Sequence, residues 1–125
     1  MRALLAALVL MLLAGSAWAE SPSPLKAGGV ITGKLRVVHT RHPNGTPITA
    51  YQLVTDKPYT VENDEFCDQD HALTVVHLVA MTKPLQKLLQ RSLNKVRSVT
   101  VGDAMCSETA WHVGDIVVFQ WELLP

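Results

Sequence analysis

Two cysteines and two of the five histidines are the residues whose types and spacing could do chemistry. Cys67 precedes His71 by four residues, and Cys106 precedes His112 by six. Two Cys and two His could bind zinc, but these spacings match no established zinc pattern. An even pair of cysteines favours a disulfide if the chain is exported, as the first nineteen residues, described below, predict. We therefore predict a Cys67–Cys106 disulfide and no metal site, with zinc as the alternative.

The remaining candidate ligands for metal ions are weaker. Residues 62–70 contain five carboxylates, but the order of ligands in an EF-hand, with its Gly and final Glu, is missing. A solvated acidic loop is the favoured interpretation, and calcium binding the alternative. His39 and His42 form an H-x-x-H across a strand end and a turn, which offers too few ligands. If the disulfide forms, His71 and His112 could approach each other and respond to pH near about 6.5.

No catalytic arrangement is recognisable in the sequence. Nucleophilic catalysis needs a nucleophile held by a base, and Ser92, Ser98 and Ser107 lie in no known motif. We therefore predict a protein that is not an enzyme, with no catalytic residue and no cofactor.

The first nineteen residues have the order of a signal peptide. Arg2 supplies a positive charge, residues 3–13 are apolar, and Ala17 and Ala19 form the A-x-A pattern before a cut. The apolar run is shorter than the roughly 20 residues that span a bilayer, so an uncleaved anchor is the less favoured alternative. We predict cleavage after Ala19 and a periplasmic or secreted protein.

Composition limits the partners of the mature chain. Removal of Arg2 leaves ten basic against eleven acidic residues, a net charge near −1. Neither the basic surface that nucleic acids require nor a polybasic membrane patch is present. The predicted partner is therefore a protein or a glycan, with no nucleic acid and no membrane span in the mature chain.

The elements that must position these residues form one domain over residues 29–125, after a disordered Ser/Pro-rich lead-in over residues 20–28. Asn44-Gly45 predicts a hairpin turn, Gly33 a bulge or tight bend, and Thr82 and Pro84 the start of a helix. The predicted strands cover residues 30–39, 48–55, 73–81, 96–102 and 111–123, with a short extension at 59–61 and a helix at 83–95.

The order of these elements predicts a mainly β fold. Five strands with one helix between the third and the fourth are typical of the OB-fold, a small Greek-key barrel. The helix carries leucines on one side and basic residues on the other, at Lys83, Lys87, Arg91 and Lys95. A solvated back is favoured for this basic row over an anion-binding face. Phe119 and Trp121 have the pattern of buried residues in the closing strand.

Several short segments resemble a known family. They are Gly33-Lys34-Leu35, residues 51–58, Val76-His77-Leu78, residues 99–102, and Thr109-Ala110-Trp111-His112. The pattern resembles domain-of-unknown-function family 4431, small exported bacterial proteins. The resemblance implies an OB-like barrel and export, and implies no activity. In architecture alone, the chain is also similar to the B subunits of bacterial AB5 toxins, which bind glycans as ring oligomers.

These features together predict an exported, non-enzymatic binding module for a partner protein or an oligosaccharide. The candidate ligand-binding residues are Trp111, His112 and His71, near the predicted disulfide. Trp111 has the parity of the core face, so core filling is its alternative role. An oligomeric glycan-binding subunit of the toxin B type and a metal-binding envelope protein are the alternative functions, and the oligomeric state is left open.

Overall fold

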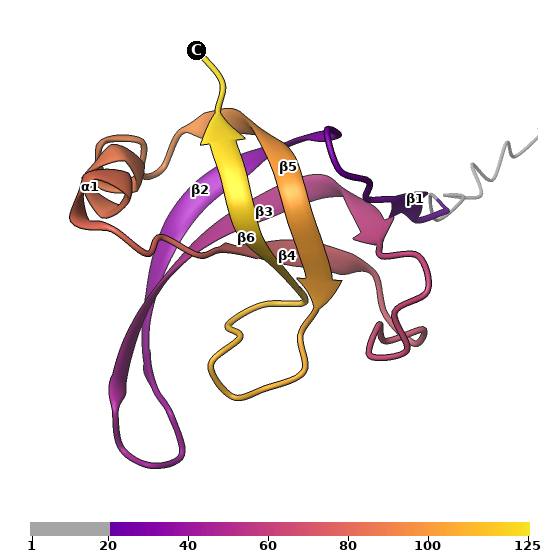
Figure 1. Ribbon diagram of the computed structural model, residues 1–125, viewed down its shortest axis with the longest axis horizontal. Helices are drawn as coiled ribbons and strands as arrows, with labels where there is room; N and C mark the ends of the chain where they lie inside the picture. The colour runs from indigo at the N-terminus through magenta and orange to yellow at the C-terminus, as the bar shows by residue number, and fades with distance from the viewer. Residues whose placement is uncertain (1–20) are drawn as a thin grey trace, which may run out of the picture.

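A computed structural model describes residues 21–125 of the chain. The predicted signal peptide, residues 1–19, and the cut after Ala19 lie outside the described residues. The elements are β1 (Ser23–Pro24), β2 (Val30–Arg41), β3 (Pro47–Thr60), β4 (Leu73–Leu78), α1 (Lys83–Arg91), β5 (Val96–Cys106) and β6 (Ile116–Leu123) (Figure 1). Within residues 21–125, no helix is long and apolar enough to cross a membrane.

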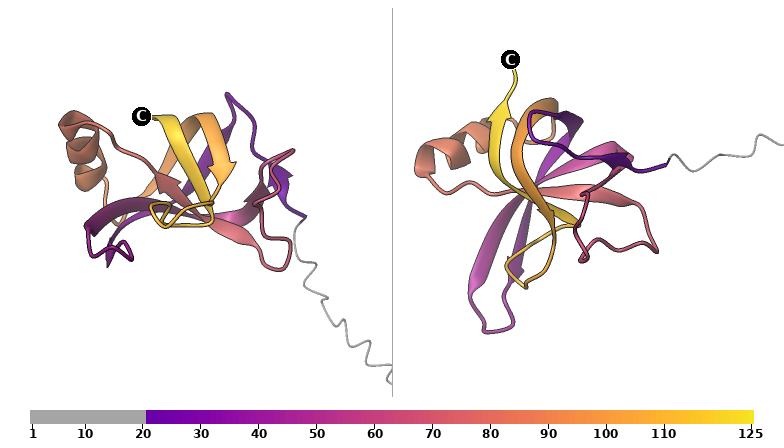
Figure 2. Two further views of the ribbon diagram at one scale, coloured as in Figure 1. Left: turned by 60° about the horizontal axis from the view of Figure 1, so that its bottom comes forward. Right: turned by 45° about the vertical axis from the view of Figure 1, so that its right-hand side comes forward.

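Five of the strands close into a barrel. The strands are paired in the order β3–β2–β5–β6–β4, and β4 pairs again with β3. All pairs in the barrel are antiparallel except β4 with β6. The two views of Figure 2 show the strands coiling around one centre. The predicted OB-like Greek-key barrel, with its helix between the third and fourth strands of the barrel, is confirmed.

The core of the barrel is filled by aliphatic side chains from all five strands and from α1. Burial alternates along the first half of β2, as expected for a strand buried on one face, whereas β3, β4 and β6 each contain a run of consecutive buried residues. A small barrel has room only for such side chains inside it. The fully buried residues include Ile31, Leu35, Leu53, Val76, Leu78, Leu89, Val99, Ile116 and Val118.

Gly33 lies where β2 pairs with two strands at once, opposite Thr55 of β3 and Arg97 of β5. A Cβ atom at this position would overlap the Val54 carbonyl group and come within 3.0 Å of the Thr55 Cα. The glycine therefore allows a backbone approach that no other residue would permit, which explains why it occupies an inward position.

The helix begins as predicted and ends earlier. The Thr82 side chain accepts a hydrogen bond from the Leu85 backbone N–H at 3.4 Å, and Pro84 lies in the first turn. The predicted end at Lys95 is wrong because Asn94 takes a left-handed conformation, with φ 65°. The Asn94 N–H then donates to the Leu35 carbonyl at 2.8 Å, which returns the chain to β2.

The predicted disordered lead-in over residues 20–28 is wrong for residues 23–25. Ser23 and Pro24 pair in parallel with Tyr59 and Thr60, and Leu25 is buried in the core cluster. The Leu25 N–H donates to the Thr60 carbonyl at 2.7 Å. A single apolar residue in a Ser/Pro-rich segment gives no periodic pattern, so the sequence does not predict this strand. The pairing of β1 is possible because β3 extends to Thr60.

The last strand also differs from its prediction. It begins at Ile116 rather than at residue 111, and its pairing with β5 shifts register around Asp103. Because the shift changes which side chains of β6 face inward, Phe119 is 40% exposed and its predicted burial is wrong. Trp121 is half-buried, and its indole N–H donates to the Val79 carbonyl at 2.9 Å.

Candidate functional site

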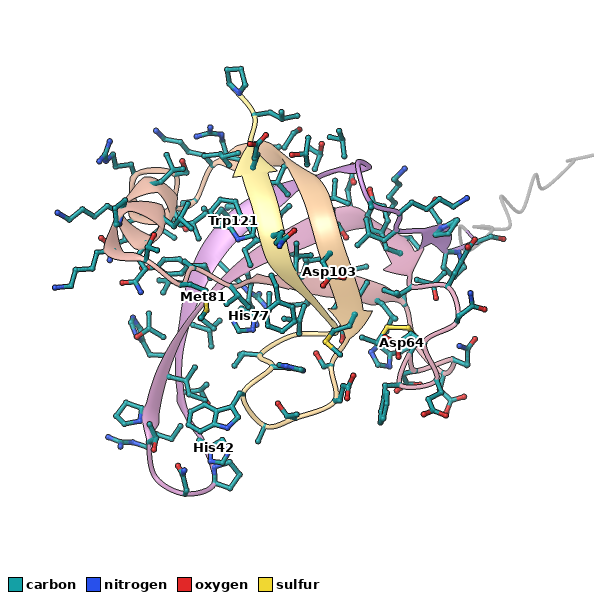
Figure 3. All side chains as sticks on the ribbon, in the orientation of Figure 1. His42, Asp64, His77, Met81, Asp103 and Trp121 are labelled. Carbon is teal, nitrogen blue, oxygen red and sulfur yellow. A yellow bond between two sulfur atoms is a disulfide. The ribbon has the colours of Figure 1, made fainter. Side chains whose placement is uncertain are left out.

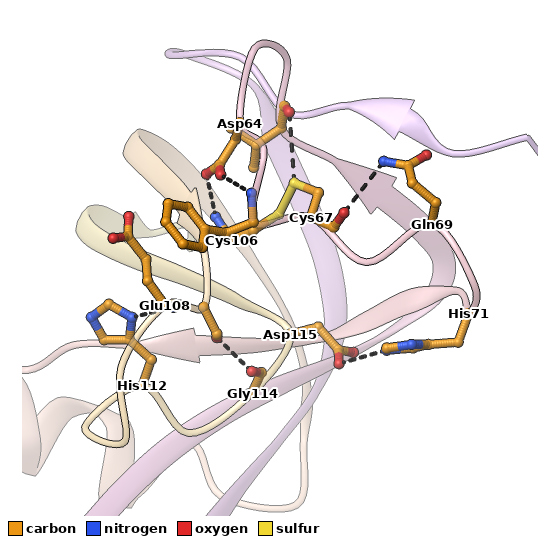
Figure 4. The surroundings of a disulfide bond; sticks show 12 residues. Asp64, Cys67, Gln69, His71, Cys106, Glu108, His112, Gly114 and Asp115 are labelled. Atoms are coloured by element: carbon orange, nitrogen blue, oxygen red, sulfur yellow. Dashed lines mark hydrogen bonds and ion pairs between the residues drawn. A yellow bond between two sulfur atoms is a disulfide. The ribbon is translucent and has the colours of Figure 1, made fainter.

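The disulfide ties an acidic loop to the end of β5. Cys67 and Cys106 are bonded, as predicted, with their Cα atoms 5.1 Å apart. The Asp64 carboxylate accepts hydrogen bonds from the Cys106 N–H at 2.8 Å and the Phe66 N–H at 2.9 Å (Figure 4). Asp64 and the two sulfurs lie within 4.8 Å of one another. Since both sulfurs are bonded to each other, the zinc alternative with Cys67 and Cys106 is wrong.

His71 lies on the far side of this loop from the other candidate residues. Its ring nitrogens contact the Asp68 carboxylate at 2.9 Å and the Asp115 carboxylate at 3.1 Å. Figure 4 shows His71 and His112 on opposite sides of Asp115, so the expected approach of these two histidines is wrong. The hydrogen bond to Asp115 raises the pKa of His71. His71 therefore links the acidic loop to Asp115, next to the start of β6, and lies apart from the candidate residue His112.

The β5–β6 loop, residues 107–115, folds over the outer face of β3 and β4. The Gln52 side-chain amide donates to the Val113 carbonyl at 2.6 Å, and the Val113 N–H donates to Nδ1 of His77 at 3.1 Å. The Arg36 guanidinium holds Gln52 from the other side, at 2.8 Å. Gln52 and His77 are both buried under the loop. This network explains why His77 lies in a strand that is mostly apolar.

Trp111 lies at the tip of this loop rather than in a strand. Its indole stacks on the imidazole of His42 from the β2–β3 turn, with ring centroids 3.9 Å apart and planes at 22°. Trp111 is nevertheless 46% exposed. The core-filling role of Trp111 is therefore wrong, and the residue is placed where a ligand could contact it.

Two further rings extend this region of the surface. His112 meets Phe119 edge to face, with centroids 5.9 Å apart. We call His42, Trp111, His112 and Phe119 the aromatic surface. His42, labelled in Figure 3 on the projecting hairpin, comes from a different part of the chain than the other three. His39 is not its partner, because the ring of His39 instead bonds to Thr49 at 3.3 Å.

Short-range hydrogen bonds hold both loops that carry the aromatic surface. In the predicted Asn-Gly turn, the Asn44 side chain accepts from the Thr46 N–H at 3.0 Å, and Gly45 takes a φ of 91°. In the β5–β6 loop, Thr109 accepts from the N–H groups of Trp111 and His112 at 3.3 and 3.1 Å. The sequence predicts Trp111 and His112 as site residues, and the structure adds His42 and Phe119. The order of strands offered a signal for His42, because the first and last loops of an OB-fold meet on one side.

Two histidines are expected to affect stability in opposite directions as pH changes. The raised pKa of His71 means that its stabilising effect is complete below its ordinary value of 6.5 and is lost as pH rises through the higher folded-state pKa. Burial, with a smaller effect of His112, lowers the pKa of His77 to about 4. Between about pH 6.5 and 4, His77 of the unfolded chain therefore binds a proton that His77 of the folded protein does not. The free energy of unfolding consequently decreases as pH falls through this range.

We accordingly expect these two histidines together to favour stability most near about pH 6.5. Urea unfolding of the mature protein from pH 4.5 to pH 8 measures this profile. The variant His71→Asn should lose the decline on the alkaline side. The variant His77→Gln, which keeps an acceptor for the Val113 N–H, should lose part of the decline on the acid side. Profiles that match the wild type in both variants would contradict these assignments.

Comparison of the chain with protein-family models found no match, and neither did comparisons with curated proteins and with solved structures. The resemblance to family 4431 therefore stays a prediction.

Proposed function

We propose that this chain is an exported, non-enzymatic module that binds an oligosaccharide on the aromatic surface. The observation that carries the proposal is the exposed indole of Trp111, stacked on His42 from a separate loop. Contacts between two loops hold this large apolar ring at the surface. There it adds little to the hydrophobic core but can contact a ligand. An exposed indole also presents a flat apolar area on which a sugar ring can lie.

The position of the aromatic surface on the barrel supports a binding role. OB-folds bind oligonucleotides and oligosaccharides on the face of their second and third strands and on the loops after strands one and four. Here those elements are β3, β4, the β2–β3 turn and the β5–β6 loop. The aromatic surface joins these two loops over that face. The ligand site used by other barrels of this type is therefore the one that carries the exposed ring.

The charge of the chain favours a glycan over a nucleic acid. Single-stranded nucleic acids need a basic groove beside the stacking rings, and the mature chain carries a net charge near −1. Export supports the same choice. The disulfide indicates an oxidising compartment, and cleavage of the predicted signal peptide after Ala19 would deliver the domain to the periplasm or the medium.

Replacement of Trp111 by alanine is expected to weaken glycan binding at least about tenfold, because the stacking area is lost. The fold should tolerate the change, since an aromatic pair at the surface contributes only about 0.5–1.5 kcal/mol. A glycan array probed with the mature protein identifies the ligand, and calorimetry with the tightest glycan measures both proteins.

Phe66→Ala is the matched control, because Phe66 is an exposed aromatic residue of the acidic loop, 52% exposed, and is not one of the four rings of the aromatic surface. This variant should bind like the wild type. Unfolding of Trp111→Ala, or an array with no bound glycan, would contradict the proposed function. If the aromatic surface binds a protein instead of a glycan, the proposed binding site would be correct and the proposed ligand class would be wrong.

A further inference from the structure

A half-enclosed pocket of about 330 Å³ lies between the start of β3, the end of β4 and α1. Its polar lining comes from Thr49, Tyr51, His77, Gln86 and Gln90. Among the described residues, no Lys, Arg, Asp or Glu lines it. Small-molecule sites occupy about 300–1,000 Å³ and orient the ligand with a few polar groups. The size and the lining therefore suit one small, uncharged ligand.

Tyr51 directs an unused hydroxyl group to this pocket. The residue is 5% exposed, and its ring packs in the barrel core. Within residues 21–125, the Tyr51 hydroxyl forms no side-chain hydrogen bond. Every fully enclosed side-chain oxygen or nitrogen atom among these residues has a hydrogen-bond partner, so the Tyr51 hydroxyl is not fully enclosed. The hydroxyl must therefore be reached from outside, and the pocket that Tyr51 lines provides the access.

His77 contributes a donor to the same pocket. Its Nδ1 accepts the Val113 N–H, so the neutral ring carries its proton on Nε2. Within the described part of the chain, Nε2 has no hydrogen-bond partner, although the residue is only 8% exposed. His77 also connects the pocket to the aromatic surface, because Val113 follows Trp111 and His112 directly in the β5–β6 loop.

Two glutamines of α1 complete the polar lining. Gln86 and Gln90 lie one helical turn apart, which places both on the side of α1 that faces the pocket. The Gln86 amide nitrogen donates to the Ala80 carbonyl at 3.2 Å, which leaves its side-chain oxygen free to accept. Gln90 forms no side-chain hydrogen bond with the residues described. The pocket thus offers both donors and acceptors without a net charge.

We infer that this pocket is a subsite for one uncharged sugar residue of the glycan that stacks on Trp111. The inference rests on the proposed function. Each hydroxyl of a sugar donates and accepts, and hydroxyl, amide and imidazole groups match that pattern. A carboxylate sugar, such as a sialic or uronic acid, would lose its hydration here without gaining a cationic partner. The pocket therefore selects neutral glycans.

The test begins with an array that carries neutral glycans and their sialylated or uronate-containing counterparts. We expect the mature protein to bind neutral glycans only. Calorimetry with the tightest neutral glycan should show about fivefold weaker binding for Tyr51→Phe, because one hydrogen bond is lost. The stability of Tyr51→Phe should match the wild type, since no protein group uses the hydroxyl.

Gln90→Glu should weaken binding about fivefold, because a carboxylate cannot donate the hydrogen bond that the amide N–H groups offer to a sugar hydroxyl. Gln69→Glu makes the same chemical change on the exposed acidic loop and should have no effect on binding. Loss of binding in Trp111→Ala alone, with both pocket variants at wild-type affinity, overturns the subsite and keeps the proposed function. Preference for acidic glycans also overturns the subsite, and absence of all glycan binding overturns both proposals.

Discussion

Replacing Cys67 and Cys106 together by alanine is expected to lower the free energy of unfolding by about 4 kcal/mol. The two residues are 39 positions apart, and closing a loop of about that length removes this much free energy from the unfolded chain on the entropy model. A domain of this size has only about 5–15 kcal/mol in total. The double variant should therefore be marginally stable, and urea unfolding at pH 7 measures the difference.

Alanine is the suitable replacement because both cysteines are buried. A reduced wild-type protein provides the control, since it keeps both side chains and lacks only the bond between them. Both forms should lose a similar amount of stability. A loss below about 1 kcal/mol would show that hydrogen bonds such as the one from the Cys106 N–H to Asp64 already anchor the acidic loop.

Replacement of Gly33 by alanine is the second large effect that we expect, a loss of about 2–4 kcal/mol. The added Cβ would overlap the Val54 carbonyl group, and this group cannot move easily because Val54 is held in the ladder between β2 and β3. To remove this overlap, β2 and β3 would have to separate at the point where β2 also pairs with β5. Thermal or urea unfolding of the variant measures the loss.

Lys34→Ala is the matched control for this position. Lys34 is the next residue of β2, and its side chain is exposed. We expect this control to stay within about 0.5 kcal/mol of the wild type, as for most surface substitutions. A Gly33→Ala variant as stable as the control would mean that the strands approach each other less closely than the structure shows.

The barrel and the disulfide could be predicted because their signals are local or nearly so. Alternation of apolar residues identified the strands, and Thr82 with Pro84 identified the start of the helix. The cysteines were an even pair in a chain with a predicted export signal. Each of these rules depends on residues close in sequence or on composition, and the fold confirms them.

The candidate site was harder to predict because it depends on contacts between distant segments. The side of the closing strand that faces the core depends on the shift in pairing around Asp103, and no local pattern shows that shift. Phe119 was assigned to the core face for this reason. Trp111 lies before this strand, which begins at Ile116. Its stack on His42 requires the β5–β6 loop to fold back over β3, which depends on Gln52 and Val113.

The polar residues of the site illustrate the same limit. His77 was noticed as the odd member of an apolar strand, but its role depends on the Val113 N–H. Tyr51 has the inward position of a core residue and occupies it, while its hydroxyl reaches the pocket. Sequence periodicity predicts which face of a strand a residue lies on. It does not predict whether the end of a long side chain, such as the Tyr51 hydroxyl, is accessible to solvent.

The proposed glycan site is tested most directly by mapping backbone amide chemical shifts while the tightest glycan from the array is added to labelled mature protein. We expect the shifted residues to cluster in the β2–β3 turn, the start of β3, the end of β4 and the β5–β6 loop. Shifts confined to the acidic loop, residues 62–70, or to the exposed Val30 and Val96 on β2 and β5 would contradict the proposed glycan site.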